Sequence, residues 1–587
     1  MTSSRVRWIV LGLLVPIHGL LLGWLACCYS PTSDEVAHLA AGVRLWRQGE
    51  FDLYAVNPPL VKAVASWPVV LAPPWEDWRH LDSRPGARPE WLVGMDLLKA
   101  NTPRFRWDFV MARWMCLPFS ILGLLYCFRW SEELFGPAGG LLSASLWCFS
   151  PNILGNAALI TPDVPATALG VAACFHFRRW WQTGRWRDAL LAGVVLGLAE
   201  LTKMTWLLLY GVLPVLWGIL EWQRKEPSST GRRAGQLGFL LFISLDVLNA
   251  GYLFDRSLQP LKEFEFTSEL LSGHRQPAGT GNRFKDSWLG ALPVPVPAAY
   301  LVGFDLQRRD FESGALISYL RGELRQGGWW YYYLYGLLIK VPLGTGLILL
   351  CCIRSKSAPG ANRSLRNESI PPDSPASKER CPQHSTSEWL LLLVPSLCLF
   401  VFVSSQTGFS RYVRYVLPVL PFLWVTLGAA WGNGSTGWRR GMAGLGLLMS
   451  LGASLAAYPH SLSFFNLLAG GPSRGHWHLL DSNVDWGQDL YFLHDWIRQH
   501  PQATPLTLAC AGVMDPQLLG IPGRPLSDSS IGRDGAPVPG WYAVSVNHLH
   551  GYDQAPPLCT WFLEKTPVAR AGNSIFIYHV PEEEETR

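Results

Sequence analysis

Two adjacent acids, Asp34 and Glu35, directly follow the first apolar stretch of the sequence, which spans residues 8–28. A carboxylate at the mouth of a membrane cavity can take a proton from a hydroxyl group as a general base. The pair also has a structural interpretation. Thr32 and Glu35 have the spacing of a capping box, and acids in a first helical turn oppose the helix dipole. The residues alone leave both interpretations open.

Further charged residues lie at or inside other apolar stretches. Asp163 falls between two of them, where it either caps the next helix or has a partner or a task, because charge close to a membrane is costly. The cations in such positions are Lys203, Lys340, Arg411 and Arg414. Lys340 either snorkels to the interface or binds an anion. Phosphate or pyrophosphate is the expected anion, since Arg makes bidentate phosphate contacts and Lys acts as a point charge.

Motifs for metal or nucleotide chemistry are weak or missing. The sequence has no Gly-x-x-x-x-Gly-Lys loop, no His-Glu-x-x-His and no Asp-x-Asp. A donor of an activated sugar would therefore lack a nucleotide. His476 and His478, with Asp481 and Asp485, could supply zinc ligands, but the neighbouring aromatics and glycines favour an ordinary turn. We predict no metal site and no cofactor.

The composition is typical of a membrane protein. Of the 587 residues, 49% are hydrophobic and 16% are charged, whereas soluble domains are about a quarter charged. The net charge of +5 is modest and the bases form no single run, which argues against nucleic-acid binding. Apolar runs of about 20 residues predict a polytopic α-helical protein with about eleven transmembrane helices. We place them near 8–28, 108–128, 137–157, 164–181, 188–201, 203–221, 236–254, 331–352, 388–406, 412–431 and 441–458.

Charge placement predicts the topology. The positive-inside rule assigns the basic loops to the cytoplasm, so an even number of spans must separate them. This parity predicts that two short helices meet near Lys203, at the outer membrane face. Residues 1–458 then form a transmembrane domain whose outer loops, 29–107 and 255–330, carry amphipathic helices. In the first of these helices, helical spacing places Val36, Leu39, Ala40, Val43 and Trp46 on one face.

The predicted remainder is a disordered cytoplasmic linker at 352–387 and a small outer-face α/β domain at 459–587. In this domain we expect two helical pieces, around 462–468 and 489–499, and strand-like runs at 506–511, 541–546 and 574–579.

In their order along the chain, these motifs resemble the protein O-mannosyltransferase-like branch of the C-type glycosyltransferases, which includes the aminoarabinose transferases. Members of this branch are multi-span enzymes that use polyprenyl- or dolichyl-phosphate-linked sugars. The resemblance covers most of the chain. It rests on Asp34-Glu35, the Pro-Pro-Leu60 segment, Thr161-Pro-Asp163, Gly197–Lys203, Trp330–Pro342, Arg414–Pro418 and the segment from Tyr458 to Asp489.

The resemblance implies that Asp34 is the catalytic base, with Glu35 beside it, and that outer-face cations hold the lipid phosphate. The predicted substrate-binding residues are Asn57, Lys62, Asp163, Lys203, Lys340, Arg411, Arg414 and Tyr415. Many bacterial members have Lys or His directly before Pro-Pro-Leu, where this chain has Asn57. Lys62 is the candidate substitute for that side chain.

These features predict a multi-pass glycosyltransferase of the inner (plasma) membrane with its active site on the periplasmic, extracytoplasmic side. It would move a sugar from a polyprenyl-phosphate donor to a hydroxyl group of a protein, a lipid or a polysaccharide. One base and a phosphate leaving group need no covalent intermediate, so we expect inversion at the anomeric carbon. Two alternatives use the same features: a lipid-linked glycan binder or transporter without transfer chemistry, and a membrane scaffold whose outer domain docks a partner.

Overall fold

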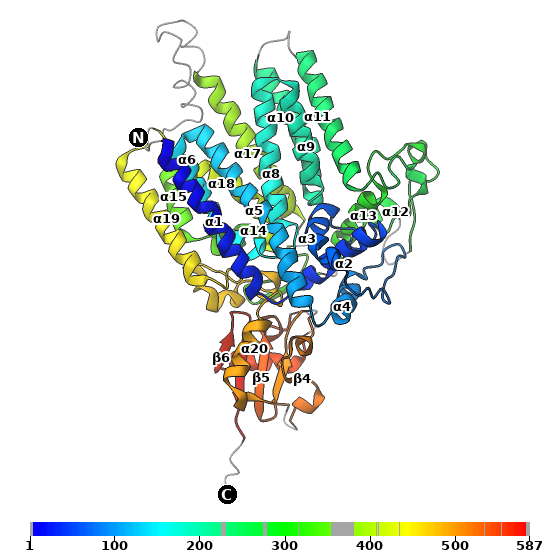
Figure 1. Cartoon of the computed structure of the whole chain (residues 1–587), viewed down its shortest axis with the longest axis vertical. Coiled ribbons are helices and arrows are strands. Elements are labelled where there is room, and N and C mark those ends of the chain that lie inside the picture. Colours follow the sequence, from blue (N-terminus) through cyan, green and yellow to red (C-terminus); the bar gives the residue numbers. More distant parts are fainter. Residues whose placement is uncertain are drawn as a thin grey trace.

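The molecule is a bundle of long helices with a small sheet at one end (Figure 1). The computed structural model describes residues 4–224, 230–273, 279–314, 316–353, 381–406, 408, 410–433, 435–512, 514–532, 535–552 and 555–582. Most of the predicted linker at 352–387 therefore lies outside the described residues.

Seven helices in the described ranges are long and apolar enough to cross a membrane, or up to eight if a bent pair counts as one span. They are α1 (Ser4–Cys28), α5 (Phe105–Phe135), η1 and α10 (Met204–Leu208, Leu209–Arg224), α11 (Thr230–Gly251), α17 (Cys381–Ser405), η7, α18 and η8 (Val413–Val419, Leu420–Leu427, Gly428–Trp431) and α19 (Gly437–Ala457). The chain is thus a polytopic helical membrane protein, as predicted. The break before η1 falls at Lys203, where the parity of the basic loops predicted it.

The prediction of about eleven spans is higher than this count. The predicted spans at 137–157 and 188–201 are shorter helices, namely α6 (Pro137–Cys148), α7 (Pro151–Ala157) and α9 (Trp186–Glu200). The predicted span at 164–181 is α8 (Asp163–Thr183). This helix is long enough, but Arg178 and Arg179 near its end make it less apolar.

The remaining predicted span, 331–352, is broken. It consists of α14 (Tyr332–Lys340) and α15 (Leu343–Ile353), which are bent by 104° relative to each other. Pro342 has no N–H group to continue the helical hydrogen bonds. Asn466, from the segment after α19, satisfies carbonyl groups at the bend: its backbone N donates to Ile339 O at 2.9 Å and its Nδ2 to Val341 O at 2.8 Å. Lys340 therefore lies at a break in the membrane segment and not inside a straight span.

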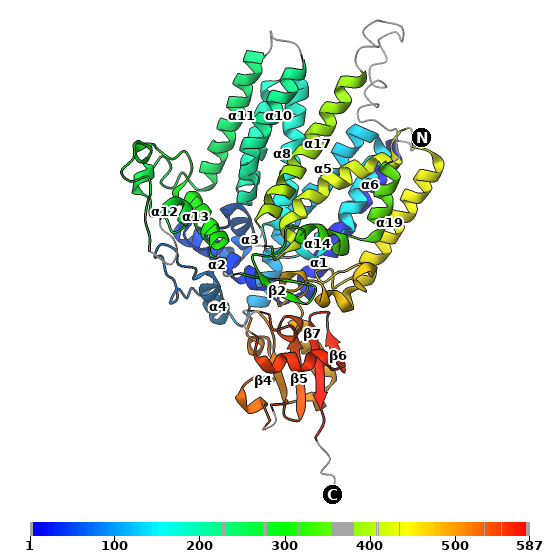
Figure 2. The same cartoon turned by 180° about the vertical axis from the view of Figure 1, so that it is seen from behind.

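Short helices gather at the end of the bundle that faces the sheet (Figures 1 and 2). Residues 29–107 contribute α2 (Ser33–Gln48), α3 (Pro59–Leu71) and α4 (Glu90–Ala100), and residues 255–330 contribute η3 (Leu261–Glu263), α12 (Glu269–Ser272), η4 (Trp288–Ala291), α13 (Ala298–Glu312), β1 (Ile317–Leu320) and β2 (Glu323–Gln326). The predicted apolar face of α2 is buried at Val36, Leu39, Ala40 and Val43, while Trp46 is exposed. This packing fixes the direction of the polar residues at the start of α2.

The C-terminal sheet has five strands in the order β4-β3-β5-β7-β6. They are β3 (Leu506–Ala509), β4 (Gly523–Pro525), β5 (Gly540–Ser545), β6 (Ala569–Ala571) and β7 (Ile575–Val580). The strand β3 pairs in parallel with β4 and β5, whereas β7 pairs antiparallel with β5 and β6. The three strands expected from the sequence are β3, β5 and β7, and the helix expected near 489–499 is α20 (Leu490–Gln499). The helix expected at 462–468 is only the short η9 (Leu467–Ala469).

Candidate active site

Two acids and two bases meet in one network where residues at the start of α2 contact the helical bundle. Asp163 Oδ1 accepts a hydrogen bond from Lys203 Nζ at 2.7 Å, and Asp163 Oδ2 accepts one from Arg414 Nη1 at 3.1 Å. The other terminal nitrogen of Arg414, Nη2, lies 3.2 Å from Asp34 Oδ2. Four of the residues predicted from the sequence therefore come together from α2, α8, the α9–η1 break and η7.

The two acids have unequal surroundings. The Asp163 side chain is 1% exposed and bridges two cations, whereas that of Asp34 is 19% exposed and pairs with Arg414. A buried carboxylate requires partners of this kind, because an unpaired buried charge is strongly destabilising. Asp163 therefore fixes the positions of the two cations. Asp34 is the acid that another molecule can reach.

Glu35 has the structural role that its capping-box spacing indicated. Its side chain is fully buried and accepts from Thr32 N at 2.9 Å, which closes the box at the start of α2. Arg113 donates to both carboxylate oxygens at 2.7 and 2.6 Å, and Ile160 N donates at 2.8 Å. These bonds hold the helix turn that carries Asp34, and they leave Glu35 no exposed surface for substrate.

Aromatic rings surround the two cations. The Arg414 guanidinium lies 3.9 Å from the ring centroid of Trp486 and 4.6 Å from that of Tyr412, and Lys203 Nζ lies 4.7 Å from that of Tyr415. A cation over a ring face is attracted by the ring quadrupole, most strongly where water is excluded. Tyr415, predicted from the sequence to bind substrate, thus lies beside a cation of the network.

Lys340 and Arg411, which we predicted to bind substrate, have other partners. Lys340 is buried, and its Nζ donates to Leu462 O at 2.9 Å and to Asn483 O at 2.7 Å. It neither snorkels to the interface nor contacts the acids of the network. Arg411 points to the C-terminal region, where its Nη2 lies 2.9 Å from Asp481 Oδ2.

Asn57 and Lys62 also lie apart from the network's hydrogen bonds. Asn57 is half-buried in the turn before α3, and its backbone N donates to Tyr54 O at 3.0 Å. Lys62 is buried and donates to the carbonyl oxygens of Leu53 and Tyr54 at 3.1 and 3.3 Å. Burial lowers the pKa of Lys62 to about 8. Its contacts are those of a residue that satisfies backbone carbonyls.

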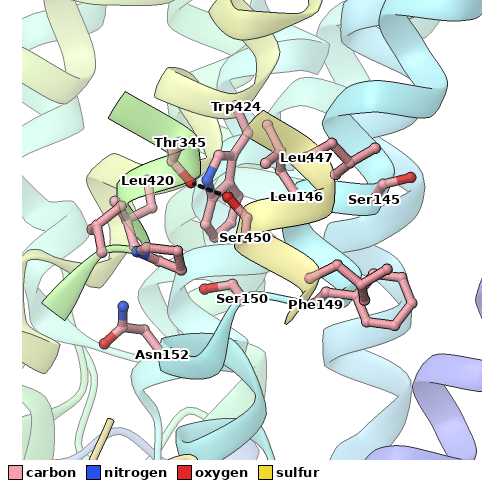
Figure 3. Close-up of a pocket in the computed structure, with 13 residues that line it drawn as sticks. Ser145, Leu146, Phe149, Ser150, Asn152, Thr345, Leu420, Trp424, Leu447 and Ser450 are labelled. Carbon is pink, nitrogen blue, oxygen red and sulfur yellow. Dashed lines mark hydrogen bonds between the residues drawn. The ribbon is translucent and has the colours of Figure 1, made fainter. Parts of the chain in front are cut away.

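Two neighbouring pockets flank the bend between α14 and α15. One is mostly apolar, with Thr345 and Ser450 hydrogen-bonded at 3.3 Å across it, and includes no residue of the charged network (Figure 3). The other is lined by Lys340 and Arg414 together with Asn156, Ser482 and others. Within the described ranges, Asn156 Oδ1, Ser482 Oγ and Arg414 Nε are buried without hydrogen-bond partners. Such atoms are costly unless a ligand or water supplies the partner.

His476 and His478, which could have supplied zinc ligands, have other partners. His476 Nδ1 lies 2.9 Å from His550 Nε2, and His478 Nδ1 lies 2.5 Å from Tyr335 Oη. In the ranges that the structure describes, no group of three or more His, Cys, Asp or Glu side chains could hold a metal ion.

Several residues of the site were not predicted from the sequence. Arg113 could have been found from the sequence, because an ionisable residue inside a predicted span usually has a partner or a function. Trp486 lies in the segment from Tyr458 to Asp489 that carries the resemblance, but its stacking on Arg414 depends on a tertiary contact between segments far apart in the sequence. His38 is buried one turn after Asp34, and burial lowers its pKa to about 3, so its imidazole is neutral at physiological pH.

Comparisons with known proteins found one family model and several solved structures that are similar to this chain. Residues 105–245, which include Asp163 and Lys203, match the family model described as dolichyl-phosphate-mannose-protein mannosyltransferase. No curated protein matches the chain in sequence. Two crystal structures of ArnT from Cupriavidus metallidurans, one bound to undecaprenyl phosphate and one in the apo state, have 13% identity to this chain. Their TM-scores are 0.44 and 0.43, with 98% of each chain covered.

A further similar structure is the Archaeoglobus fulgidus oligosaccharyltransferase in complex with zinc and sulfate. It has 10% identity and a TM-score of 0.38, with 94% of this chain and 71% of that chain covered. The family model covers residues 105–245, less than half of the chain, and agrees with the resemblance that the ordered motifs predicted.

Proposed function

We propose that the protein transfers a sugar from a polyprenyl-phosphate donor to an acceptor hydroxyl group, with Asp34 as general base. One observation carries this proposal. Asp34 is a reachable carboxylate beside a pair of cations, Lys203 and Arg414, that the buried Asp163 holds in place. Transfer from a lipid phosphate requires both elements: a base for the acceptor and positive charge for the departing phosphate.

The reaction would proceed in one displacement. Asp34 takes the proton of the acceptor hydroxyl while its oxygen forms a bond to the anomeric carbon. The bond from that carbon to the phosphate oxygen breaks, and the lipid phosphate leaves with the electron pair. Because no enzyme atom bonds to the sugar, the anomeric configuration inverts. A positioned base typically contributes a factor of 10²–10⁴.

The two cations would stabilise the departing phosphate. Arg414 and Lys203 both lie next to Asp34 or its neighbour Asp163, and fixed charges aimed at a developing anion lower the barrier. An incoming phosphate competes with Asp34 for Arg414, which would free the carboxylate to accept a proton. We assign no phosphate contact to Lys340 or Arg411, since their hydrogen bonds go to protein partners.

The lipid part of the donor fits the location of the site. The network lies at the ends of helices that are long and apolar enough to cross a membrane, next to the segments predicted to be outside. A polyprenyl tail in the bilayer would leave only the head group to be positioned, which reduces the entropic cost of the encounter. We propose that the site opens to the extracytoplasmic side.

The test is transfer from a labelled polyprenyl-phosphate sugar by membranes that contain either the wild-type chain or Asp34→Asn. We expect a product of inverted configuration with the wild type and a rate at least 100-fold lower with the variant. Transfer by the variant at a near-normal rate would remove Asp34 from this role. Donor binding without transfer or hydrolysis by the wild type would instead favour the binder or transporter.

A further inference from the structure

The segment Asp481–Leu490 lies between the C-terminal sheet and the candidate active site. Three acidic residues in it, spaced four residues apart, form hydrogen bonds to residues at the sheet. Asp485 and Asp489 do so through their carboxylates, and Asp481 does so through its backbone N. Asp485 accepts from the Ser545 hydroxyl, and Asp489 Oδ2 accepts from Ser574 Oγ at 2.8 Å. The backbone N of Asp481 donates to Asn547 Oδ1 at 2.8 Å. All three acids are thereby attached to residues at or next to β5 and β7.

The other side of the same segment holds the turn that precedes Asp34. Ser30 N donates to Gln488 O at 3.0 Å, and Ser30 Oγ donates to Gly487 O at 2.6 Å. Ser33 N donates to Trp486 O at 3.3 Å. Since Ser33 is the first residue of α2, these bonds fix where the helix that carries Asp34 begins.

The side chain of Trp486 provides the third connection. It is 5% exposed, and its ring lies 3.9 Å from the Arg414 guanidinium carbon. Among the rings that the structure places near Arg414, that of Trp486 is the closest. A stacked ring restricts the rotation of a guanidinium group and so keeps its terminal nitrogens directed at Asp34 and Asp163.

We propose that Trp486 is a positioning residue for Arg414, and that the segment around it makes the C-terminal sheet part of the active site. This inference rests on the proposed function, because Arg414 is there assigned to the lipid phosphate. The sheet then has a role in the reaction besides any contact with an acceptor. Loss of the ring leaves Arg414 free to adopt other rotamers and weakens its contact to the phosphate.

The experiment uses the full chain in lipid nanodiscs and a polyprenyl phosphate without sugar as the probe. We expect Trp486→Leu to bind the probe about tenfold more weakly, and Trp486→Phe to retain affinity within about threefold of the wild type. The matched control is Trp561→Leu, which removes a comparable ring, 4.5 Å from Lys565 Nζ, elsewhere in the C-terminal region. The control should bind the probe as the wild type does.

A double variant separates positioning from a general structural effect. If Trp486 acts through Arg414, Trp486→Leu causes no further loss of affinity in an Arg414→Gln background. An equal loss in both backgrounds would overturn the inference, as would unchanged binding by Trp486→Leu. If the wild type itself fails to bind the probe, the proposed function is wrong and the inference falls with it.

Discussion

Arg411 and Arg414 lie three residues apart, yet they belong to different parts of the molecule. Arg414 is at the start of η7 and pairs with Asp34 and Asp163, next to Lys203. Arg411 precedes η7 and binds Asp481 and the hydroxyl of Tyr552 in the C-terminal region. One arginine thus lies in the proposed reaction centre, whereas the other connects the membrane helices to the C-terminal region.

The two ion-pair groups also differ in their balance of charge and exposure. In the Arg414 group, two acids face two bases, and the central carboxylate of Asp163 is 1% exposed. In the Arg411 group, one base faces Asp481, whose side chain is 19% exposed, and tyrosine hydroxyls supply the other contacts. A buried, balanced group with one reachable acid suits substrate binding. A single ion pair with no buried acid, supplemented by neutral tyrosine hydroxyls, suits attachment of the C-terminal region.

The largest difference in stability between the two groups is expected when an acid of each group, Asp163 or Asp481, loses its charge. Asp163→Asn leaves Lys203 and Arg414 without their buried partner and should lower the free energy of unfolding by about 3 kcal/mol or more. Asp481→Asn affects a partly exposed pair and should cost about 1 kcal/mol. Thermal unfolding in detergent measures both. Equal losses would contradict the distinction between the two groups.

Loss of the arginines should separate catalysis from stability. Arg414→Gln removes the proposed contact to the leaving phosphate, so the transfer rate should fall about 100-fold or more. Arg411→Gln should change that rate by less than about tenfold, because its partners lie in the C-terminal region. The measurement is transfer from a labelled donor at matched amounts of folded protein. A larger effect at position 411 would reverse our assignment.

The pH dependence of stability should reflect Asp485, which lies in the segment Asp481–Leu490. Burial raises the pKa of Asp485 to about 7, so between about pH 4 and 7 the folded state holds a proton that the unfolded state has lost. Stability should therefore fall as pH rises through this range, by at most about 1.4 kcal/mol per pH unit from this group. Asp485→Asn should show a flatter profile in thermal unfolding. Parallel profiles would show that another group titrates.

The smallest effect on stability and transfer is expected when a single hydroxyl group, that of Tyr552, is removed. Tyr552→Phe removes a hydrogen bond to Asp481 and the two from Nε and Nη2 of Arg411, and should lower the free energy of unfolding by about 1 kcal/mol. Transfer by this variant should stay within about twofold of the wild type, since the Arg414 group is untouched. A strong loss of transfer with unchanged stability would place Tyr552 in the reaction centre.

Local patterns explain what could be predicted from the sequence. Helical spacing predicted most of the buried face of α2, basic loops predicted the break at Lys203, and short strand-like runs predicted β3, β5 and β7. These features depend on neighbours in the chain. The motifs also singled out Asp34, Asp163 and Lys203, which lie in the same network as Arg414.

Long-range contacts explain what could not be predicted. Arg411 and Arg414 have the same chemistry and almost the same position, and only the folded arrangement brings Asp481 to one and Asp34 to the other. Lys340 appeared to lie in a continuous span, but the bend at Pro342 brings it to the carbonyl groups of Leu462 and Asn483. Such partners lie 70 or more residues away in the sequence, so spacing carries no information about them.

The most direct test of the central claim separates binding from chemistry at Asp34. Single-turnover transfer at saturating donor and the affinity for a polyprenyl phosphate are measured on the same Asp34→Asn preparation. We predict an affinity within about threefold of the wild type, because Lys203, Arg414 and Asp163 remain, and a transfer rate at least 100-fold lower. A wild-type rate, or a loss of affinity as large as the loss of rate, would contradict the assignment of Asp34 as the base.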